Sequence, residues 1–420
     1  MPSVEGLPAR RAALQMLDAV LRRGRTLDSA AQGARDLKPA DQALAVAITG
    51  EVLRRMPDLD ALIDSATRQR LPDDSKARMV LRAALAQKVG LGTPEHALVA
   101  TALPLVDGGP RRLVHGVLGT LLRRGVPPMD SPRLPEAVEQ RWGKAWGGDA
   151  VASARRLIAK RPPLDLSFID DAAAKAFAER MGGRSLATNH VRLQNAGAVS
   201  ELSGFAQGGW WVQDLAASLP ARMIPANAGD VLDLCAAPGG KTMQMAGAGH
   251  RVTAIDQSES RLKRLRENLD RTGLSAQLVA ADALKWSPDR TFDAILLDAP
   301  CSATGTFRRH PEVLYRARPA IIRDAADLQR QLLNRASAWL KPGGALVYSV
   351  CSLEPEEGEE VVSAFLEANP NFSIDPPNAG ELPDFVTPGE DGRVRVLPGA
   401  LESDGGLDGF FVARLVRTAT

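Results

Sequence analysis

The chain is poor in cysteine and in aromatic residues, and it contains no long apolar run. Three cysteines in 420 residues cannot form a disulfide framework, which favours a reducing cytoplasm. Aromatic residues make up only 4%, so the hydrophobic cores must be built from Leu, Val, Ile and Ala. No stretch approaches the roughly 18 uncharged apolar residues that span a membrane, and the N-terminal MPSVEGLPARR lacks the apolar segment of a signal peptide. We therefore expect a cytoplasmic protein with neither a membrane segment nor a bound metal.

The net charge of +2 hides an uneven distribution along the chain. Residues 1–350 hold 48 basic and 36 acidic side chains, a net +12, whereas residues 351–420 hold 4 and 14, a net −10. A basic body favours a phosphate-rich partner such as RNA, with an ordinary solvated surface as the alternative. Much of the acidic segment is one cluster, which predicts the first turn of a helix, where the dipole favours carboxylates: Glu354, Glu356, Glu357, Glu359 and Glu360.

Residues 1–130 show the periodicity of successive amphipathic helices. Helices are predicted at about residues 8–23, 40–56, 74–89, 95–106 and 111–124, with Pro, Gly and Asp in the connections. Arginines recur near the helix ends, where they either cap the helix dipole or form a surface that faces RNA: Arg22, Arg23, Arg25, Arg111, Arg112, Arg123 and Arg124. The region is predicted to be an all-α bundle. A Pro-rich linker at residues 126–135 then leads into a small α+β linking subdomain, residues 131–228.

Residues 229–420 show a different pattern, in which strands alternate with helices. Five apolar strands are predicted: VLDLCAA, RVTAID, QLVAADA, FDAILLDAP and ALVYSVCS. Helices are predicted between them, including residues 259–272 and 321–340, and VRVLP and GFFVARLV are predicted to add two closing strands. This alternation is typical of an α/β fold with a parallel, doubly wound, Rossmann-like sheet.

The loop at residues 233–242, DLCAAPGGKT, joins the first of these strands to the first helix, where doubly wound sheets bind their ligands. GGKT matches the end of a phosphate-binding P-loop, but the first glycine of that motif would fall at Cys235. The dinucleotide fingerprint G-x-G-x-x-G is also incomplete, which argues against a hydride-transfer oxidoreductase. A glycine loop without a pyrophosphate cradle suits S-adenosylmethionine, which carries no phosphate. Asp256 and Asp282, after the next two strands, are predicted to bind the ribose hydroxyls and the adenine amino group, although such residues also cap helices.

Cys301 and Cys351 follow the fourth and fifth strands, in DAPCSATG and YSVCSLEPEE. Neighbouring strands would open both thiols onto one pocket, which is a better explanation than two structural cysteines placed there by chance. Carbon 5 of cytosine needs a thiol, because addition of a thiolate to carbon 6 makes carbon 5 nucleophilic enough to attack a methyl sulfonium. Asp298 is placed to neutralise charge at N3 of the ring. Because methylation of an amino group needs no cysteine, the pair predicts carbon methylation of a pyrimidine.

The sequences DLCAAPGGKT, DAPCSATG and CSLEPEE resemble the motifs of the RsmB/Nop/Sun family of RNA cytosine-5 methyltransferases. VQDLAASL and DGFFVARL are similar to the family's segments on either side of the cofactor fold, so the resemblance covers about residues 145–420. The N-terminal helices look like the NusB-type RNA-binding bundle of RsmB-like members. That combination implies small-subunit (16S) ribosomal RNA as the substrate and S-adenosyl-L-methionine as the cofactor.

The resemblance also implies a role for each matching residue. Cys351 would be the nucleophile, Cys301 would assist product release, and Asp298 would lie between the cofactor and the base. The cofactor would lie on the loop and the strand-end acids: Cys235, Ala236, Ala237, Pro238, Gly239, Gly240, Lys241, Asp256, Asp282 and Asp298. Chemistry alone does not decide which of the two thiols is the nucleophile. DNA cytosine-5 methyltransferases use a Pro-Cys nucleophile, and Pro300 precedes Cys301 here.

Two alternatives remain at this point. The chain could methylate cytosine in transfer RNA or another RNA, or it could be a non-catalytic RNA-binding or ribosome-assembly protein that retains the fold. The two thiols beside Asp298 argue against a pure binding protein, which would have no use for them. The partner is expected to be ribosomal RNA or a small-subunit assembly particle, and a monomer is favoured.

Overall fold

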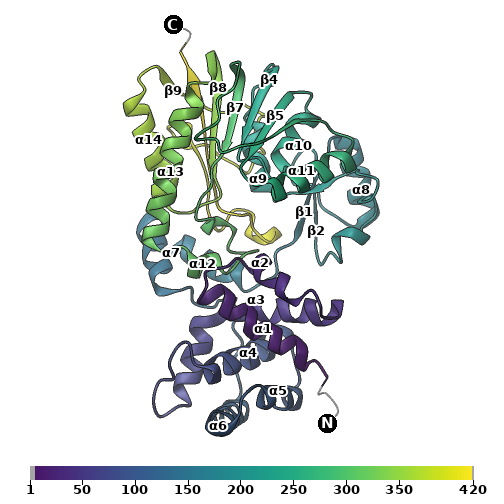
Figure 1. Cartoon of the computed structure of the whole chain (residues 1–420), viewed down its shortest axis with the longest axis vertical. Helices are drawn as coiled ribbons and strands as arrows, with labels where there is room; N and C mark the ends of the chain where they lie inside the picture. Colours follow the sequence, from purple (N-terminus) through teal and green to yellow (C-terminus); the bar gives the residue numbers. More distant parts are fainter. Residues whose placement is uncertain (1–4, 419–420) are drawn as a thin grey trace. The chain divides into compact units, whose positions relative to one another are not determined.

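Helices fill the N-terminal third of the chain and strands begin only at Leu164 in the computed structural model, which describes residues 5–418 (Figure 1). The chain divides into two units. The helical unit consists of Met1–Arg161 together with Phe307–Arg316, and the catalytic unit consists of Pro162–Thr306 together with Ala317–Thr420. Among the described residues, no helix is both long and apolar enough to cross a lipid bilayer.

The helical unit is a bundle whose helices bury their apolar faces in one core. Leu17, Ile48, Leu81 and Leu118 come from four different helices and are completely buried there. The five predicted helices are confirmed, with most ends shifted by a few residues and one helix longer than predicted. The helices are α1 (Leu7–Leu21), α2 (Leu27–Ala31), α3 (Pro39–Ser65), α4 (Lys76–Leu91), α5 (Glu95–Ala102), α6 (Gly108–Arg124), α7 (Glu136–Ile158) and α12 (Val313–Arg316).

α3 is longer than predicted. The sequence predicts an end near residue 56, because Pro57 lacks the N–H that continues a helix. The helix nevertheless continues to Ser65, and α4 holds the added turns in place. Asp60 accepts hydrogen bonds from Arg78 Nη1 at 3.0 Å and from Arg82 Nε at 2.7 Å. Tertiary ion pairs therefore outweigh the local effect of the proline.

The boundary predicted at residue 130 lies inside the helical unit, and the structure moves it to Arg161. The residues in between form α7, which is kinked at Gly147 with a φ of 82°. Arg54 Nη1 and Arg55 Nη2 donate to the carbonyl oxygens of Ile158 and Ala159 at 3.0 and 2.9 Å. Glycines within α7 conceal the helix in the sequence, since glycine is a poor helix former.

The segment Phe307–Arg316 returns from the catalytic unit and packs within the helical unit. Tyr315 Oη donates to Leu53 O at 2.8 Å, and Leu27 N donates to Glu312 Oε1 at 2.9 Å. The rings of Phe307 and Trp142 lie 5.4 Å apart. The sequence gives no sign of this exchange, because the segment lies in the middle of the predicted catalytic domain.

A small antiparallel sheet opens the catalytic unit. Its strands lie in the order β2-β1-β3 and α8 packs beside them, as expected for a small α+β subdomain. Its elements are β1 (Leu164–Ser167), α8 (Asp171–Met181), β2 (His190–Leu193) and β3 (Trp211–Val212).

Over residues 5–418, the main sheet has eight strands in the order β10-β11-β8-β7-β4-β5-β6, with β9 paired to β11. The five predicted strands β4 to β8 run parallel, whereas β9, β10 and β11 are antiparallel additions, so the sheet is mixed rather than wholly parallel. The strands are β4 (Asp230–Leu234), β5 (Arg251–Asp256), β6 (Gln277–Ala280), β7 (Phe292–Asp298), β8 (Leu340–Val350), β9 (Phe372–Ile374), β10 (Val394–Val396) and β11 (Phe410–Arg417).

Helices cover both faces of the main sheet (Figure 1). Alternate residues of the parallel strands enter different cores: Val231 packs with α9, α10 and α11, whereas Leu232 packs with α13 and α14. Burial on both faces explains the continuous apolar runs of these strands. The helices are α9 (Leu215–Arg222), α10 (Gly240–Gly247), α11 (Glu259–Thr272), α13 (Pro319–Ser337) and α14 (Glu359–Ala368).

The acidic cluster is only partly the helix start that the sequence predicts. Glu359 and Glu360 do lie in the first turn of α14. Glu357 belongs to a preceding 3₁₀ turn, Pro355–Glu357, and is completely buried. Its carboxylate accepts hydrogen bonds from the loops that carry the two cysteines. Glu357 therefore joins two loops and does not start a helix as Glu359 and Glu360 do.

Candidate active site

The carboxyl ends of the parallel strands meet at one edge of the main sheet, and the predicted site residues lie there. Cys235 follows β4, Asp256 ends β5, and Asp282 follows β6. Asp298 ends β7, and Cys351 follows β8. The structure thus brings together at one edge the residues that the sequence singled out.

The loop between β4 and α10 requires glycine where it passes α11. Gly239 has a φ of 104°, and a Cβ there would lie 2.0 Å from Leu265 Cδ1. Only glycine meets both demands. Two residues earlier, Ala237 N donates to Asp256 Oδ2 at 3.2 Å, which ties the loop to the end of β5.

Asp256 and Asp282 line one cavity, of about 60 Å³, together with Cys235. Asp256 is 2% exposed, and its Oδ1 accepts a hydrogen bond from Ser258 N at 2.9 Å. Apolar side chains form much of the wall: Ile255, Ala281, Ala283, Leu284, Pro300, Leu328 and Leu332. An apolar cavity with carboxylate acceptors suits a nucleoside, whose hydroxyl and amino groups are donors.

Arg261 belongs to the same cavity and was not predicted. Its Nη1 lies 3.3 Å from Asp256 Oδ2, and its Nη2 donates to the carbonyl oxygen of Ala237. It therefore links the cofactor loop to the strand-end acid. The sequence offers no signal for this, because Arg261 is one of several arginines on α11.

Asp298 forms a polar group with two neighbours at the end of β7. Lys241 Nζ lies 2.7 Å from Asp298 Oδ2, and Ser349 Oγ donates to Asp298 Oδ1 at 2.9 Å. The Lys241 ammonium also lies 5.3 Å from the centre of the Phe410 ring. The cofactor loop and the two cysteine strands are thus connected through one carboxylate.

The two predicted thiols lie next to one another. Cys301 Sγ and Cys351 Sγ are 3.5 Å apart, a hydrogen-bond distance for sulfur and too long for a disulfide. Pairing of Asp298 with Ser349 in the β7–β8 register sets the two loops side by side. The hydrogen bond to Cys351, followed by burial, raises the pKa of Cys301 well above its usual value. Cys301 therefore keeps its proton near neutral pH, and either sulfur can be the donor of this hydrogen bond.

The third thiol is separate from this pair. Burial, and then the charges of Asp298 and Asp256, raise the pKa of Cys235 to about 12. Cys235 therefore stays protonated near neutral pH and cannot act as a nucleophile, because the thiolate is the reactive form.

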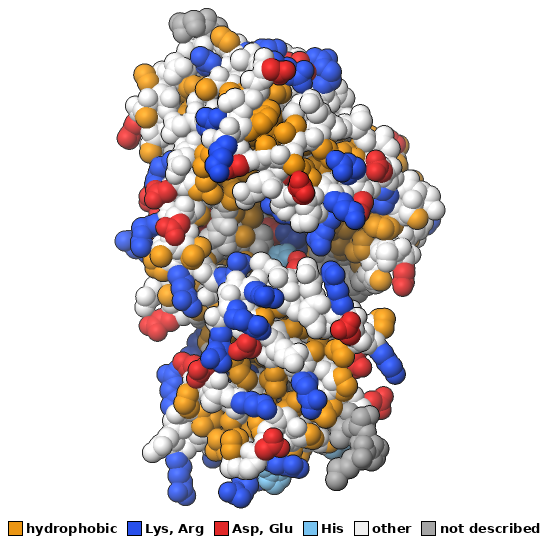
Figure 2. All heavy atoms as spheres, viewed as in Figure 1, with side chains coloured by type: hydrophobic (Ala, Val, Ile, Leu, Met, Phe, Trp, Pro, Cys, Tyr) orange, Lys and Arg blue, Asp and Glu red, His pale blue; other side chains and the backbone are white. Residues whose placement is uncertain are grey.

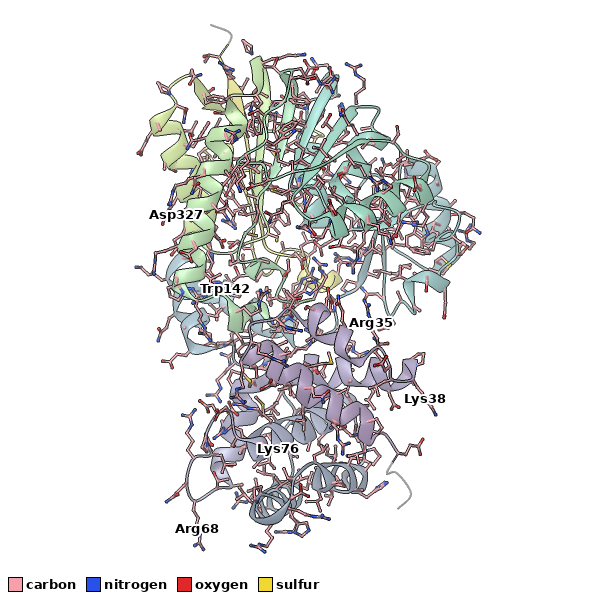
Figure 3. All side chains as sticks on the ribbon, in the orientation of Figure 1. Arg35, Lys38, Arg68, Lys76, Trp142 and Asp327 are labelled. Atoms are coloured by element: carbon pink, nitrogen blue, oxygen red, sulfur yellow. The ribbon has the colours of Figure 1, made fainter. Side chains whose placement is uncertain are left out.

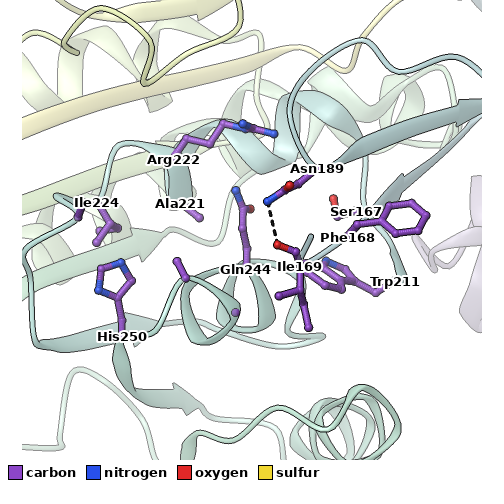
Figure 4. Close-up of a pocket in the computed structure, with 13 residues that line it drawn as sticks. Ser167, Phe168, Ile169, Asn189, Trp211, Ala221, Arg222, Ile224, Gln244 and His250 are labelled. Carbon is purple, nitrogen blue, oxygen red and sulfur yellow. Dashed lines mark hydrogen bonds between the residues drawn. The ribbon is translucent and has the colours of Figure 1, made fainter. Parts of the chain in front are cut away.

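A second cavity, of about 250 Å³, lies near the opposite edge of the sheet (Figure 4). Among its lining residues are Asn189, Arg222, Gln244 and His250. His250 immediately precedes β5, and both α9 and α10 end beside the cavity. None of the predicted site residues is among those that line it.

Basic side chains are spread over the helical unit (Figure 2). Arg35, Lys38, Arg68 and Lys76 extend from its ribbon and are exposed (Figure 3). All seven predicted arginines are exposed as well. Of these, Arg22 and Arg23 pair with Asp18 at 3.4 and 3.3 Å.

Two family models match the chain. The model described as the NusB family matches residues 7–123, within the helical unit. The model described as 16S rRNA methyltransferase RsmB/F matches residues 221–416, from α9 to β11.

Curated relatives match nearly the whole chain. The ribosomal RNA small subunit methyltransferase B of Erwinia tasmaniensis is 32% identical over 441 residues, which cover 96% of this chain and 97% of the relative. The protein of the same name from Xanthomonas campestris pv. campestris is 34% identical over 440 residues, covering 99% and 98%.

Solved structures share the fold. The crystal structure of PH0851 gives a TM-score of 0.73 at 23% identity and covers 97% of this chain and 98% of its own. NSun6 from Pyrococcus horikoshii, in complex with the S-adenosylmethionine analogue SFG, gives 0.59 at 21% identity and covers 69% and 99%.

Proposed function

Since the chain belongs to the RsmB/F family of 16S rRNA methyltransferases, we propose that it methylates carbon 5 of a cytosine in small-subunit ribosomal RNA, through a covalent adduct of Cys351. As a member, it is an S-adenosylmethionine-dependent RNA methyltransferase. The observation that carries the finer proposal is the 3.5 Å separation of the two sulfur atoms, beside Asp298 at the carboxyl edge of the sheet. Methylation of an exocyclic amine would need neither thiol.

The side chains that line the cavity beside Cys235 suit the nucleoside part of the cofactor, which supplies the methyl group on its sulfonium sulfur. Asp256 would accept hydrogen bonds from the ribose hydroxyls, and Asp282 would accept one from the adenine amino group. The loop would carry the methionine end of the cofactor, through Cys235, Ala236, Ala237, Pro238, Gly239, Gly240 and Lys241. Asp298, held by Lys241 and Ser349, would stand between the cofactor and the base.

Cys351 would act as the nucleophile. Its thiolate forms a bond to carbon 6, the C5–C6 double bond shifts its electron pair into the ring, and N3 gains a proton. Asp298 would stabilise the charge that develops at N3. Carbon 5 is then electron-rich and accepts the methyl group. Loss of the carbon 5 and N3 protons restores the C5–C6 double bond and expels the Cys351 thiolate, so that one proton is released overall.

Cys301 would remove the carbon 5 proton. In the free protein its pKa is raised, first by the hydrogen bond to Cys351 and then by burial. Once Cys351 is bonded to carbon 6, Cys301 would pass its own proton to solvent and, as a thiolate, accept the proton from carbon 5. Cys351 would thus be the attacking thiol and Cys301 the thiol of product release.

Replacement of each thiol tests this division of roles. Cys351→Ala should abolish methylation and form no adduct. Cys301→Ala should still attack and accept the methyl group, and then accumulate as an RNA-linked, ribonuclease-sensitive band on a denaturing gel. The double variant should give no band. A band with Cys351→Ala alone would reverse the two roles, and normal turnover by both single variants would remove covalent catalysis.

The helical unit is proposed to bind the RNA, and 16S ribosomal RNA or a small-subunit assembly particle is the proposed substrate. Bisulfite sequencing of ribosomal RNA from cells that lack the protein would locate the cytosine. A new unmethylated cytosine in transfer RNA, with 16S RNA unchanged, would transfer the proposal to that substrate. No change in any RNA, with binding retained, would indicate an assembly protein that keeps the fold.

A further inference from the structure

A serine directly follows each of the two thiols, and both serine hydroxyls donate to the same carboxylate. Ser302 Oγ and Ser352 Oγ each donate to Glu357 Oε2. Ser302 N donates to Glu357 Oε1 at 2.7 Å. One side chain therefore connects the loop of Cys301, after β7, to the loop of Cys351, after β8.

α13 completes the surroundings of this carboxylate. Gln329 Nε2 donates to Glu357 Oε1 at 3.2 Å and to Pro300 O at 2.8 Å. Each carboxylate oxygen thus accepts two hydrogen bonds. Tyr348 Oη also donates to the backbone carbonyl of Glu357 at 2.5 Å. Four donors aimed at two oxygens match an ionised carboxylate, which has acceptors only.

The charge of Glu357 is costly where it lies. The side chain is completely buried, and no Lys or Arg nitrogen of residues 5–418 comes within 4 Å of its carboxylate. Burial accordingly raises the pKa of Glu357, although the four hydrogen bonds act against this shift. Two loops could be held together by neutral or apolar side chains at a smaller cost, so a buried, unpaired carboxylate at this position calls for a further role.

That role concerns the distance between the sulfur atoms. Other contacts also join the two loops: Gly305 N donates to Cys351 O at 3.0 Å, Leu353 N donates to Thr304 Oγ1 at 3.0 Å, and Ser302 Oγ lies 3.2 Å from Ser352 Oγ. Glu357 adds a carboxylate that bonds to both serine hydroxyls and to Ser302 N, on the residue directly after each thiol. It therefore helps to set the spacing of the two serines, and with them the spacing of the two cysteines.

We propose that Glu357 is a positioning residue for the thiol pair: by tying Ser302 to Ser352, it holds Cys301 within reach of the ring carbon next to the one that Cys351 attacks. Glu357 touches neither cofactor nor base, and acts through the two loops. The catalytic meaning of this inference rests on the proposed function. The spacing of the thiols, however, is a property of the free protein and can be measured without any methylation.

Glu357→Asp in the full-length chain is the variant of choice, because it keeps the charge but shortens the side chain, so it cannot reach both serines. Diamide, which takes two electrons and two protons from a pair of thiols, would convert Cys301 and Cys351 into a disulfide detectable by peptide mass mapping. We expect the variant to form this disulfide about ten- to a hundredfold more slowly than the unchanged protein. Glu360→Asp, the same substitution at an exposed residue of the acidic cluster, should match the unchanged protein.

Methylation kinetics give the second readout. Glu357→Asp should lower kcat, leave the KM for RNA unchanged and accumulate the RNA-linked band expected of Cys301→Ala. In a Cys301→Ala background, adding Glu357→Asp should leave the rate at which the RNA-linked band forms unchanged, because its effect passes through Cys301. Ser352→Ala, which removes one hydrogen bond only, provides a milder variant if Glu357→Asp does not fold.

The outcomes separate this inference from the proposed function. An unchanged rate of disulfide formation in Glu357→Asp overturns the positioning role, whatever happens to methylation. Slower formation of the RNA-linked band when Glu357→Asp is added to Cys301→Ala overturns it as well. A slower disulfide together with normal turnover by both Cys351→Ala and Cys301→Ala leaves the positioning role standing and overturns the covalent mechanism alone.

Discussion

Asp256 offers the most direct test of the cofactor site at the scale of a single residue. It is buried at the end of β5 and lines the cavity proposed for the ribose. Asp256→Ala should weaken binding of S-adenosylhomocysteine by about 1–3 kcal/mol, roughly 5- to 150-fold in Kd, because buried hydroxyl groups would lose their acceptor. Calorimetry measures this directly, and ATP and NAD should show no binding.

Asp327→Ala is the matched control for this measurement. Asp327 lies on α13, its side chain is 67% exposed, and it points away from the ribbon (Figure 3). The control should leave the affinity unchanged. Equal affinity of Asp256→Ala and Asp327→Ala for S-adenosylhomocysteine would contradict the assignment of Asp256 to the ribose.

Residue types and strand ends were enough to predict most of the site, but not the side chains that support it. Cys301, Cys351 and Asp298 could be recognised because each is a reactive group at the end of an apolar strand. Glu357 could not, because in the sequence it is one of several adjacent glutamates and only the tertiary structure buries it. Arg261 escaped prediction for the same reason, as one of several basic residues on an amphipathic helix.

At the scale of elements, the turn between β4 and α10 depends on one glycine. Gly239→Ala should lower the Tm and weaken cofactor binding, because the new Cβ would lie 2.0 Å from Leu265 Cδ1. The collision should add about 1–3 kcal/mol to the ordinary penalty for a positive φ. Gly249 has a similar φ of 92°, and nothing lies within 4 Å of a Cβ added there. Gly249→Ala should therefore lose only the stability that the positive φ costs. Equal Tm values, measured by scanning calorimetry, would show that α11 yields to the methyl group.

The elements were predicted well where periodicity and burial agree. Residues 259–272 form α11 as expected, because its apolar positions recur at helical spacing and Gly273 ends it. Prediction failed where a local signal was misleading. Pro57 suggested the end of a helix that ion pairs with α4 prolong, and the glycines of α7 concealed a helix that is held by Arg54 and Arg55.

At the scale of the molecule, the proposed binding of RNA depends on arginines that have no acidic partner. Among the described residues, Arg25, Arg111 and Arg112 have no carboxylate within 4 Å. Replacing all three with Gln should weaken RNA binding and reduce the slope of log K against log salt by roughly 0.7–0.9 for each phosphate that the variant no longer neutralises. Fluorescence titrations at several salt concentrations measure both quantities.

Arg22→Gln with Arg23→Gln is the control in the same unit, since Asp18 already offsets these charges at 3.4 and 3.3 Å. It should change the salt slope less than the triple variant does. An unchanged slope in the triple variant would mean that these arginines cap helix dipoles and do not contact RNA.

The excursion of Phe307–Arg316 into the helical unit also restricts how such a protein can change by recombination. The chain passes between its two units three times, after Arg161, after Thr306 and after Arg316. A gene exchange that replaced residues 1–161 alone would leave Glu312 and Tyr315 facing a bundle with which they had not co-evolved. The N-terminal helices and a decapeptide from the middle of the gene must therefore be inherited together, so this helical domain cannot be shuffled as an independent module.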